Sequence, residues 1–362
     1  MNQTAQPVTD ALQTKCNACG GFMHYSPDEE NLKCVYCGSI VDLDKTAARI
    51  TENDFHYWKD RANESAGDDM VEMPEIKCRQ CGATTSLPAN VSGAKCAFCS
   101  TPLIMNEATV KRFWQPNYLL PFKVSSRTGG KNFAQWIGGK WFAPSALKKN
   151  AVSFDTFKGV YLPFWTYDSN TFTEYKGQRG IDRRVRYKDA KGDTRERIVT
   201  DWYPAAGQVK VAFDDVLVPA SKTLPQSIAG RLTNWDLANC VAYRKEFLAG
   251  FVTEIYQRDF RESLVDAKTL MQPVIEHTIY RDIGGDRQRI SSSQTRYDNL
   301  MFKHLLLPVW ISAFRYNNQL YQFVVNGRTG QITGNYPKST GKIVAIVLGV
   351  IAVIVALWWM TN

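Results

Sequence analysis

An uninterrupted apolar run at the carboxyl end most constrains what this chain can fold into. The eighteen residues Ile343–Met360 carry no charge, and Lys338 and Lys342 precede them. About twenty apolar residues in a helix span the roughly 30 Å hydrocarbon core of a bilayer. The alternative is a buried helix of a soluble core, but a run without a polar face fits poorly inside one domain. We therefore predict a transmembrane tail anchor over residues 342–360.

The residues that flank this run predict its orientation. Lysines lie on its amino side, whereas Trp358 and Trp359 stand at its far end, where indole rings favour the headgroup level. Because cytoplasmic flanks carry an excess of lysine and arginine, we expect a single-pass protein with residues 1–340 in the cytoplasm. Residues 1–14 are too polar for a signal peptide, and we expect a flexible N-terminus there.

Composition and charge leave several classes of partner open. The chain is 44% hydrophobic and 22% charged, which is typical of a globular protein and argues against wholesale disorder. Its formal net charge of +9 suits a nucleic-acid surface, but equally an anionic membrane surface held close by the anchor. Charge alone does not distinguish these partners.

Eight of the nine cysteines form two quartets with the same spacing. In each quartet, two CxxC pairs are separated by fourteen residues, so that two tight turns can present four thiolates to one metal ion. Tetrathiolate sites suit Zn²⁺, although iron also binds such sites. We assign two Zn²⁺ ions per chain, with Cys16, Cys19, Cys34 and Cys37 as ligands of the first and Cys78, Cys81, Cys96 and Cys99 as ligands of the second.

The spacing places two zinc ribbons, over residues 15–42 and 76–105, joined by a linker with a short helix over 43–75. Gly20, Gly38 and Gly82 follow three of the CxxC pairs and Ser100 follows the fourth, at a position that often needs a positive φ. These segments resemble zinc ribbons of the transcription-factor-B type. Since four cysteines leave no open coordination position, we expect a metal that stabilises the fold and does not catalyse.

Residues 115–337 predict a β-rich domain with an internal repeat. One sequence motif recurs as Leu120-Pro-Phe122, Leu162-Pro-Phe-Trp165 and Leu307-Pro-Val-Trp310. Alternating apolar and polar residues follow the second and third copies. We expect these prolines to lie in an edge strand or at the first position of a strand. After the third copy of the motif, turns at Asn317-Asn318 and Asn326–Gly330 predict a meander.

A second predicted hairpin, Phe172–Trp202, carries a basic strip. We interpret it as a solvated hairpin, and leave open whether residues 179–197 bind lipid or nucleic acid. The basic side chains are Arg179, Arg183, Arg184, Arg186, Lys188, Lys191, Arg195 and Arg197.

Helices and catalytic motifs are sparse. Gln257–Ile283 has apolar residues at helical spacing, and we expect Pro273 to kink or split it. Cys240 stands apart from the quartets and is expected to be a small buried hydrophobe. Because the chain has no phosphate-binding P-loop, HExxH or GxSxG motif, we expect no enzymatic activity and no catalytic residue. The predicted fold class is mainly β with some α: two tandem zinc ribbons, a repeated-hairpin β domain with helices, and one transmembrane helix.

The order of these motifs resembles a bacterial family of membrane proteins with two CxxC zinc ribbons and a C-terminal transmembrane helix. Its members are often encoded beside SPFH (flotillin-like) and PspA-type proteins, and are sometimes labelled primosomal or helicase-like. The segments Phe213–Ser221 and Phe247–Phe251 and the string VVNGRTGQITG also carry the resemblance.

The resemblance implies an adaptor that recruits cytoplasmic proteins, such as SPFH-like or PspA-like proteins, to the inner (plasma) membrane in an envelope stress response. A membrane-tethered nucleic-acid-binding protein that acts in replication is the alternative. The sequence leaves open the identity of the partners, which ribbon contacts them, the activating signal, and whether the chain forms homo-oligomers.

Overall fold

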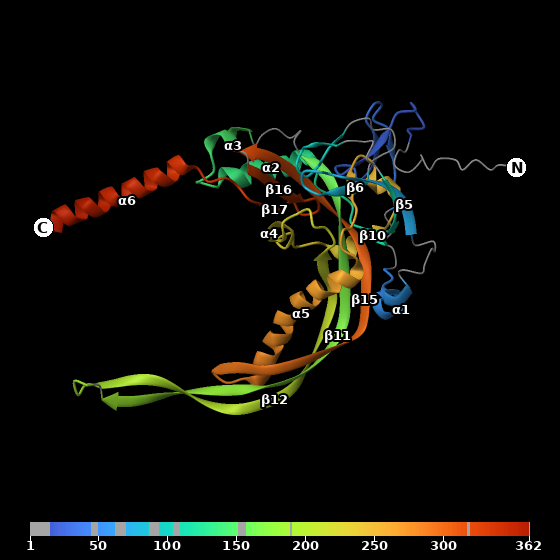
Figure 1. The fold of residues 1–362 in the computed structure, drawn as a ribbon. Helices are drawn as coiled ribbons and strands as arrows, with labels where there is room; N and C mark the ends of the chain where they lie inside the picture. The colour runs from blue at the N-terminus through green and yellow to red at the C-terminus, as the bar shows by residue number, and fades with distance from the viewer. Residues whose placement is uncertain are drawn as a thin grey trace.

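The computed structural model describes residues 15–44, 50–61, 70–86, 94–103, 109–150, 157–188, 190–316 and 319–361. The fold is mainly β with some α, as the sequence predicts. One long, curved sheet forms the body, the N-terminal ribbons lie at one end, and helix α6 projects from the opposite side (Figure 1).

Ribbon 1 is a small three-stranded antiparallel sheet of its own. Its strands are β1 (Met23–Ser26), β2 (Asn31–Cys34) and β3 (Ile40–Val41). The segment after it contains β4 (Asn53–Asp54) and the short helix α1 (Phe55–Arg61), inside the range where a short helix is expected. Ribbon 2 and its flanks contain β5 (Met70–Lys77), β6 (Thr84–Ser86), β7 (Ala94–Lys95), β8 (Pro102–Leu103) and β9 (Thr109–Trp114).

The body is a sheet in which two strands are very long. The hairpin of β11 (Lys158–Lys188) and β12 (Thr194–Pro219) contains the predicted hairpin and exceeds it, and β15 (Arg287–Tyr316) pairs with β11 along much of its length. Shorter strands complete the sheet: β10 (Tyr118–Leu119), β13 (Val241–Ala242), β14 (Val252–Glu254), β16 (Gln319–Asn326) and β17 (Ile332–Gly334). Strands β15, β16 and β17 form the predicted meander, while its turn residues Asn317-Asn318 lie outside the described residues.

The three copies of the leucine-proline motif lie side by side. Leu162 of β11 is the register partner of Leu307 of β15, and Leu120 N–H donates to the Leu306 carbonyl at 3.0 Å. The expectation that the prolines occupy edge or first positions is wrong for Pro163 and Pro308, which lie inside central strands.

Their position in the ladder explains why these strands tolerate proline. The Pro163 carbonyl accepts from Ala220 N–H at 3.0 Å, just beyond the end of β12, and the Pro308 carbonyl accepts from Gly327 N–H at 2.8 Å, just beyond β16. A residue's N–H and C=O point to the same neighbouring strand. The missing N–H of each proline therefore faces a strand end, and the ladder between β11 and β15 is preserved.

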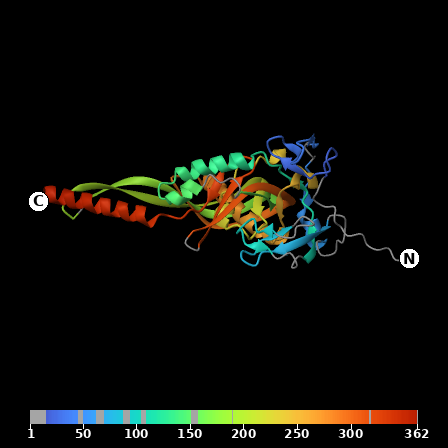
Figure 2. The ribbon, with the colours of Figure 1, turned by 90° about the horizontal axis from the view of Figure 1, so that it is seen from above.

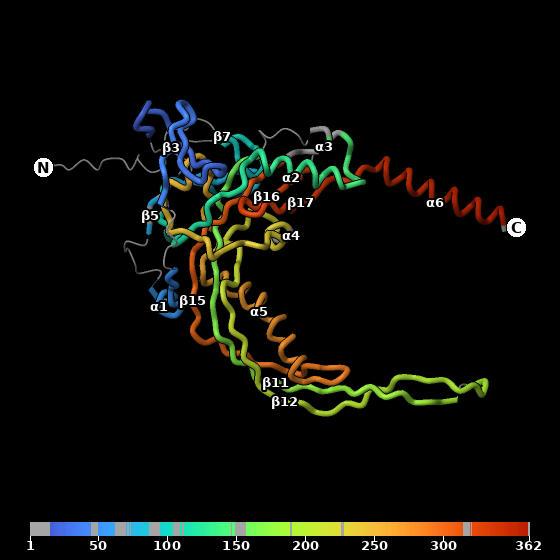
Figure 3. Tube along the Cα trace, turned by 180° about the vertical axis from the view of Figure 1, so that it is seen from behind, coloured from blue at the N-terminus to red at the C-terminus, as the bar shows by residue number. Residues whose placement is uncertain are grey.

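Helix α5 (Phe260–Ile283) packs on the concave side of the long strands (Figures 1 and 3). Its buried residues, which include Ala267, Met271, Ile275 and Ile279, lie at helical spacing on both sides of Pro273. Of the expected kink or split at Pro273, the split is wrong, because the helix is continuous there. Pro273 is exposed, so water can hydrogen-bond to the carbonyl that the proline leaves free.

The remaining helices of the body are shorter than α5. They are α2 (Ser126–Gly138), α3 (Ser145–Asn150), α4 (Gln226–Ala229), and the 3₁₀ turns η3 (Leu237–Asn239) and η4 (Lys245–Leu248). Helix α6 (Thr340–Thr361) extends away from the body, as Figure 2 shows from above. Its segment Thr340–Met360 has 21 residues, none of them buried, and at 1.5 Å per residue is about 32 Å long. It is therefore long and apolar enough to span a membrane.

Candidate metal centres

The four cysteine pairs fold into four turns with the same hydrogen bonds. In the turn that begins at Cys16, the Cys16 N–H donates to the Gly21 carbonyl at 2.7 Å and the Gly20 N–H donates back to the Cys16 carbonyl at 2.8 Å. The turns that begin at Cys34, Cys78 and Cys96 repeat both bonds at 2.8–3.1 Å. This closed backbone loop aims both thiols of a pair to the same side, where the other pair of the ribbon meets them.

Backbone geometry confirms the role expected for the residue after each pair. Gly20, Gly38 and Gly82 have φ of 73°, 76° and 75°, and Ser100 has φ of 61°. This left-handed conformation is open to glycine and costs a residue with a Cβ about 1 kcal/mol or more. Ser100 therefore holds the one strained turn of the four.

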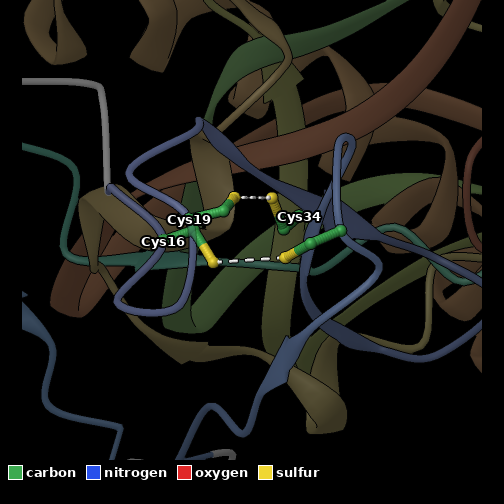
Figure 4. Close-up of side chains that lie close together, drawn as sticks. Cys16, Cys19 and Cys34 are labelled. Atoms are coloured by element: carbon green, nitrogen blue, oxygen red, sulfur yellow. Dashed lines mark hydrogen bonds between the residues drawn. The ribbon is translucent and has the colours of Figure 1, made fainter.

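Sulfur distances in both quartets fit a tetrahedral metal site. Cys16 lies 3.6 Å from Cys37 and Cys19 lies 3.5 Å from Cys34, measured between sulfurs (Figure 4). In the second quartet the sulfurs of Cys78–Cys99 and Cys81–Cys96 are each 3.6 Å apart.

Four sulfurs at about 2.3 Å from a central zinc are about 3.8 Å apart, whereas a disulfide joins its sulfurs at about 2.0 Å. All four ligand atoms of each quartet lie within 4.8 Å of one another. The eight residues predicted from the sequence thus converge into two sites that can bind metal ions, and a set of four thiols suits zinc.

Local hydrogen bonds favour the thiolate form in part of each quartet, and the bond between Cys81 and Cys96 raises the pKa of Cys81 while it lowers that of Cys96. The Ser39 hydroxyl, 3.1 Å from the Cys37 sulfur, and the Ser39 backbone N–H together lower the pKa of Cys37 to about 6. In ribbon 2, the hydrogen bond from Cys81 lowers the pKa of Cys96 to about 5. Each quartet thus contains a sulfur that is deprotonated near neutral pH.

Ribbon 2 is built into the body sheet. Strand β6 pairs with β5 on one side and with β14 of the body on the other, so the sheet runs from β9 into β11 without interruption. Body side chains also hold its turns: Gln257 donates to the Gly82 carbonyl at 3.1 Å, and Gln322 donates to the Phe98 carbonyl at 2.9 Å. Strand β5 begins at Met70, inside the range expected for the linker, because β9 pairs with its whole first part.

Ribbon 1 instead forms its own sheet and packs against the body through buried side chains that include Met23, Tyr25 and Leu32. The Tyr25 hydroxyl donates to the Phe122 carbonyl at 3.1 Å, and its ring lies 5.6 Å from that of Phe247. Cys19 and Cys37 are exposed, in contrast to the largely buried second quartet. Five large apolar side chains of ribbon 1 are also exposed, which we call the ribbon 1 patch: Phe22, Val35, Tyr36, Ile40 and Val41.

A buried lysine with three acidic partners was not found from the sequence. Lys303 is 3% exposed, and its ammonium lies 2.9 Å from Glu52, 3.5 Å from Asp168 and 2.6 Å from Asp215. Burial, with the hydrogen bond to Glu52, raises the pKa of Asp168 to about 7. Carboxylates from β11, β12 and the segment before β4 meet here only in the folded chain, so no spacing in the sequence indicates them.

One other sequence expectation concerns a single residue. Cys240 is buried, as expected, and burial raises the pKa of its thiol to about 12. A buried, protonated thiol packs like a small hydrophobic side chain.

Two ribbons with metal-binding quartets, a β body and one apolar C-terminal helix together fit a zinc-ribbon membrane protein. The chain is similar to the protein YdjG of Bacillus subtilis (strain 168), which is described as uncharacterized. The two are 23% identical over 345 residues, which cover 94% of this chain and 94% of YdjG. No family model matches the chain, and no solved structure does.

Proposed function

We propose that this protein is a zinc-binding adaptor, anchored in the inner membrane by α6, that recruits cytoplasmic proteins through ribbon 1. The ribbon 1 patch is the observation that carries the proposal. Val35 is 58% exposed and Tyr36 is 74% exposed, whereas the described side chains of ribbon 2 contribute no large exposed hydrophobic residue. Exposed apolar and aromatic side chains that are grouped on one module are typical of protein-binding surfaces.

The arrangement of the molecule supports this role. Ribbon 1 lies at the end of the body away from α6 (Figures 1 and 2), so a helix that enters the membrane leaves ribbon 1 pointing away from that membrane. The zinc ion would hold the two turns of ribbon 1 together and keep Tyr36 in place beside Gly21. By resemblance, we propose SPFH-like or PspA-like proteins as partners and envelope stress as the setting.

A pull-down from detergent-solubilised membranes tests the proposal. The double variant Val35→Ser/Tyr36→Ser removes the most exposed part of the patch, and Val110→Ser/Tyr57→Ser removes the same residue types from β9 and α1, where they are 67% and 52% exposed. We expect partner proteins to be recovered with the wild type and the control, and at least about tenfold less with the patch variant. All three should retain two zinc ions per chain.

Two outcomes would contradict the adaptor. One is equal recovery of the same proteins by both double variants. The other is recovery of DNA or RNA that is lost steeply as salt rises, which favours the nucleic-acid-binding alternative.

A further inference from the structure

The outer part of the β11–β12 hairpin projects as a two-stranded arm. Pairing between β11 and β15 ends at Gly180 and Arg287, whereas pairing between β11 and β12 continues to Lys188 and Thr194. We call residues 181–201 the basic arm. Its described side chains are largely exposed on both faces, so the arm contributes little to the core of the body.

The basic arm and α6 project to the same side of the molecule. Figures 1, 2 and 3 all show this, and the tip of the arm reaches about as far as the end of α6. The base of α6 is held to the body: Ser339 N–H donates to the Phe142 carbonyl at 2.8 Å, and Lys342 Nζ donates to the Trp141 carbonyl at 2.9 Å. Trp141 is itself 59% exposed beside this base, where an indole suits the headgroup level.

A membrane that receives α6 therefore meets the arm as well. The arm cannot enter hydrocarbon, because its outer strand edges present unpaired backbone groups and its side chains carry many charges. It can lie along the headgroups if residues 335–339, which join β17 to α6 and belong to neither, bend so that α6 enters the membrane at an angle to the arm. The headgroup layer is thus the surface that the arm contacts.

The register of the hairpin separates its side chains into two faces. Val185 pairs with Arg197 and Tyr187 with Arg195, and the Arg197 guanidinium lies 5.4 Å from the centre of the Tyr187 ring. Because cross-strand partners share a face, this Tyr187 face carries three arginines and one aspartate among apolar side chains. Its members are Ile181, Arg183, Val185, Tyr187, Arg195, Arg197, Val199 and Asp201.

The opposite face is closer to neutral and less apolar. Three of its side chains are basic and two are acidic, and the Arg186–Glu196 pair at 2.9 Å satisfies one of each, as the Arg183–Asp201 pair at 2.6 Å does on the Tyr187 face. Its members are Asp182, Arg184, Arg186, Lys188, Thr194, Glu196, Ile198 and Thr200. Arginine, tyrosine and aliphatic side chains on one surface are the combination that suits an anionic membrane interface.

We propose that the basic arm binds anionic phospholipid headgroups through its Tyr187 face, in the same bilayer that α6 crosses. The arm then acts as a second membrane contact that fixes the tilt of the body and the direction in which ribbon 1 faces. This inference rests on the membrane anchoring included in the proposed function. It does not depend on which partner ribbon 1 recruits.

The test uses the full chain reconstituted into vesicles of phosphatidylcholine alone or of phosphatidylcholine with phosphatidylglycerol. Proteinase K, which does not require arginine or lysine, is added outside, and cleavage within the arm is followed by mass spectrometry. We expect cleavage to be roughly tenfold slower with phosphatidylglycerol, and high salt to abolish the protection. The variant Arg195→Glu/Arg197→Glu should lose this protection, whereas Arg184→Glu/Lys188→Glu, with the same change in charge, should keep most of it.

Several outcomes would overturn the proposal. Equal cleavage rates in the two lipids would exclude a contact with anionic headgroups. Equal loss in both double variants would exclude the Tyr187 face. Protection in pure phosphatidylcholine that grows with protein density would indicate contact between arms of two copies, and protection that requires added RNA would indicate a nucleic-acid surface. Flotation of the chain with both kinds of vesicle reports insertion of α6 separately, so failure of the arm and failure of the anchor are distinguishable.

Discussion

At the scale of single residues, the turn position after each cysteine pair decides local strain. A Cβ at Gly82 would meet no atom within 4 Å, so Gly82→Ala changes only the backbone preference at φ of 75°. We expect this variant to lower the free energy of unfolding of ribbon 2 by about 1 kcal/mol, and Ser100→Gly to raise it by a similar amount.

Thermal unfolding of the zinc-loaded chain checks both signs. Gly138→Ala is the control, because Gly138 lies in α2 and its added Cβ would also meet no atom within 4 Å. Alanine is favoured in a helix, so this variant should be neutral or stabilising. Destabilisation by Ser100→Gly would show that the serine has a role beyond its backbone conformation.

A second residue-scale prediction concerns His304, which is fully buried against Trp165 with ring centres 4.5 Å apart. Burial lowers the pKa of His304 to about 4, below its ordinary 6.5. The unfolded chain therefore binds a proton that the folded chain does not, so this contribution to stability is present above pH 6.5 and is lost as the pH falls toward 4. The loss amounts to about 3 kcal/mol.

Urea unfolding of the solubilised chain, followed by circular dichroism, measures the difference between the wild type and His304→Phe. We expect this difference to move by about 3 kcal/mol in favour of the variant between pH 7 and pH 4. A pH-independent difference would mean that the folded and unfolded chains titrate alike at this position. Glu254, whose pKa burial raises to about 8, contributes the opposite slope to both proteins, so the comparison removes it.

At the scale of elements, the two ribbons differ in how they depend on the body. Cys16→Ser/Cys19→Ser should remove one zinc and unfold ribbon 1, because a ribbon of this size has little apolar core without its metal. The body should keep its structure, since ribbon 1 forms a separate sheet.

The matched variant Cys78→Ser/Cys81→Ser should also remove one zinc, but should destabilise the body by several kcal/mol, because β5 and β6 belong to the same sheet as β11. Zinc content and the midpoint of body unfolding check both variants. Two zinc ions retained by either variant would contradict the assigned ligands, and equal effects on the body would contradict the different roles of the ribbons.

Element-scale prediction from the sequence succeeded where the pattern is local. The meander of β15 to β17 and the helix ending at Ile283 follow from the turn residues and from helical spacing. Pro163 and Pro308 were interpreted wrongly, and the split considered at Pro273 does not occur, because the effect of a proline depends on which neighbouring group faces its missing N–H. That neighbour is set by the end of another strand or by solvent, and neither can be known from the residues beside the proline.

At the scale of the whole molecule, the proposed membrane anchor depends on α6, which is long and apolar enough to span a membrane. Ile351 lies near the middle of the segment Thr340–Met360, so Ile351→Arg should cost about 3 kcal/mol of insertion free energy and shift the protein out of the membrane fraction. Thr340→Arg places the same charge at the start of the helix, where it can reach the headgroups, and should leave the protein in the membrane.

Extraction with alkaline carbonate, followed by immunoblotting of pellet and supernatant, compares these two variants. The wild type and Thr340→Arg should stay in the pellet, and a chain without residues 340–362 should appear in the supernatant. The anchor would be excluded if the wild type were released without detergent.

The sequence by itself determined the eight cysteines of the two sites that can bind metal ions, and the apolar helix. Both depend on short-range chemistry: a CxxC pair forms its own turn, and an uncharged run of helix length needs no partner to be recognised. Tertiary structure decided which ribbon is embedded and which is exposed, that Lys303 meets three carboxylates, and that the basic arm points to the same side as α6. These features depend on pairing between strands far apart in the chain, and the free energy of such pairing comes from packing that no local pattern records.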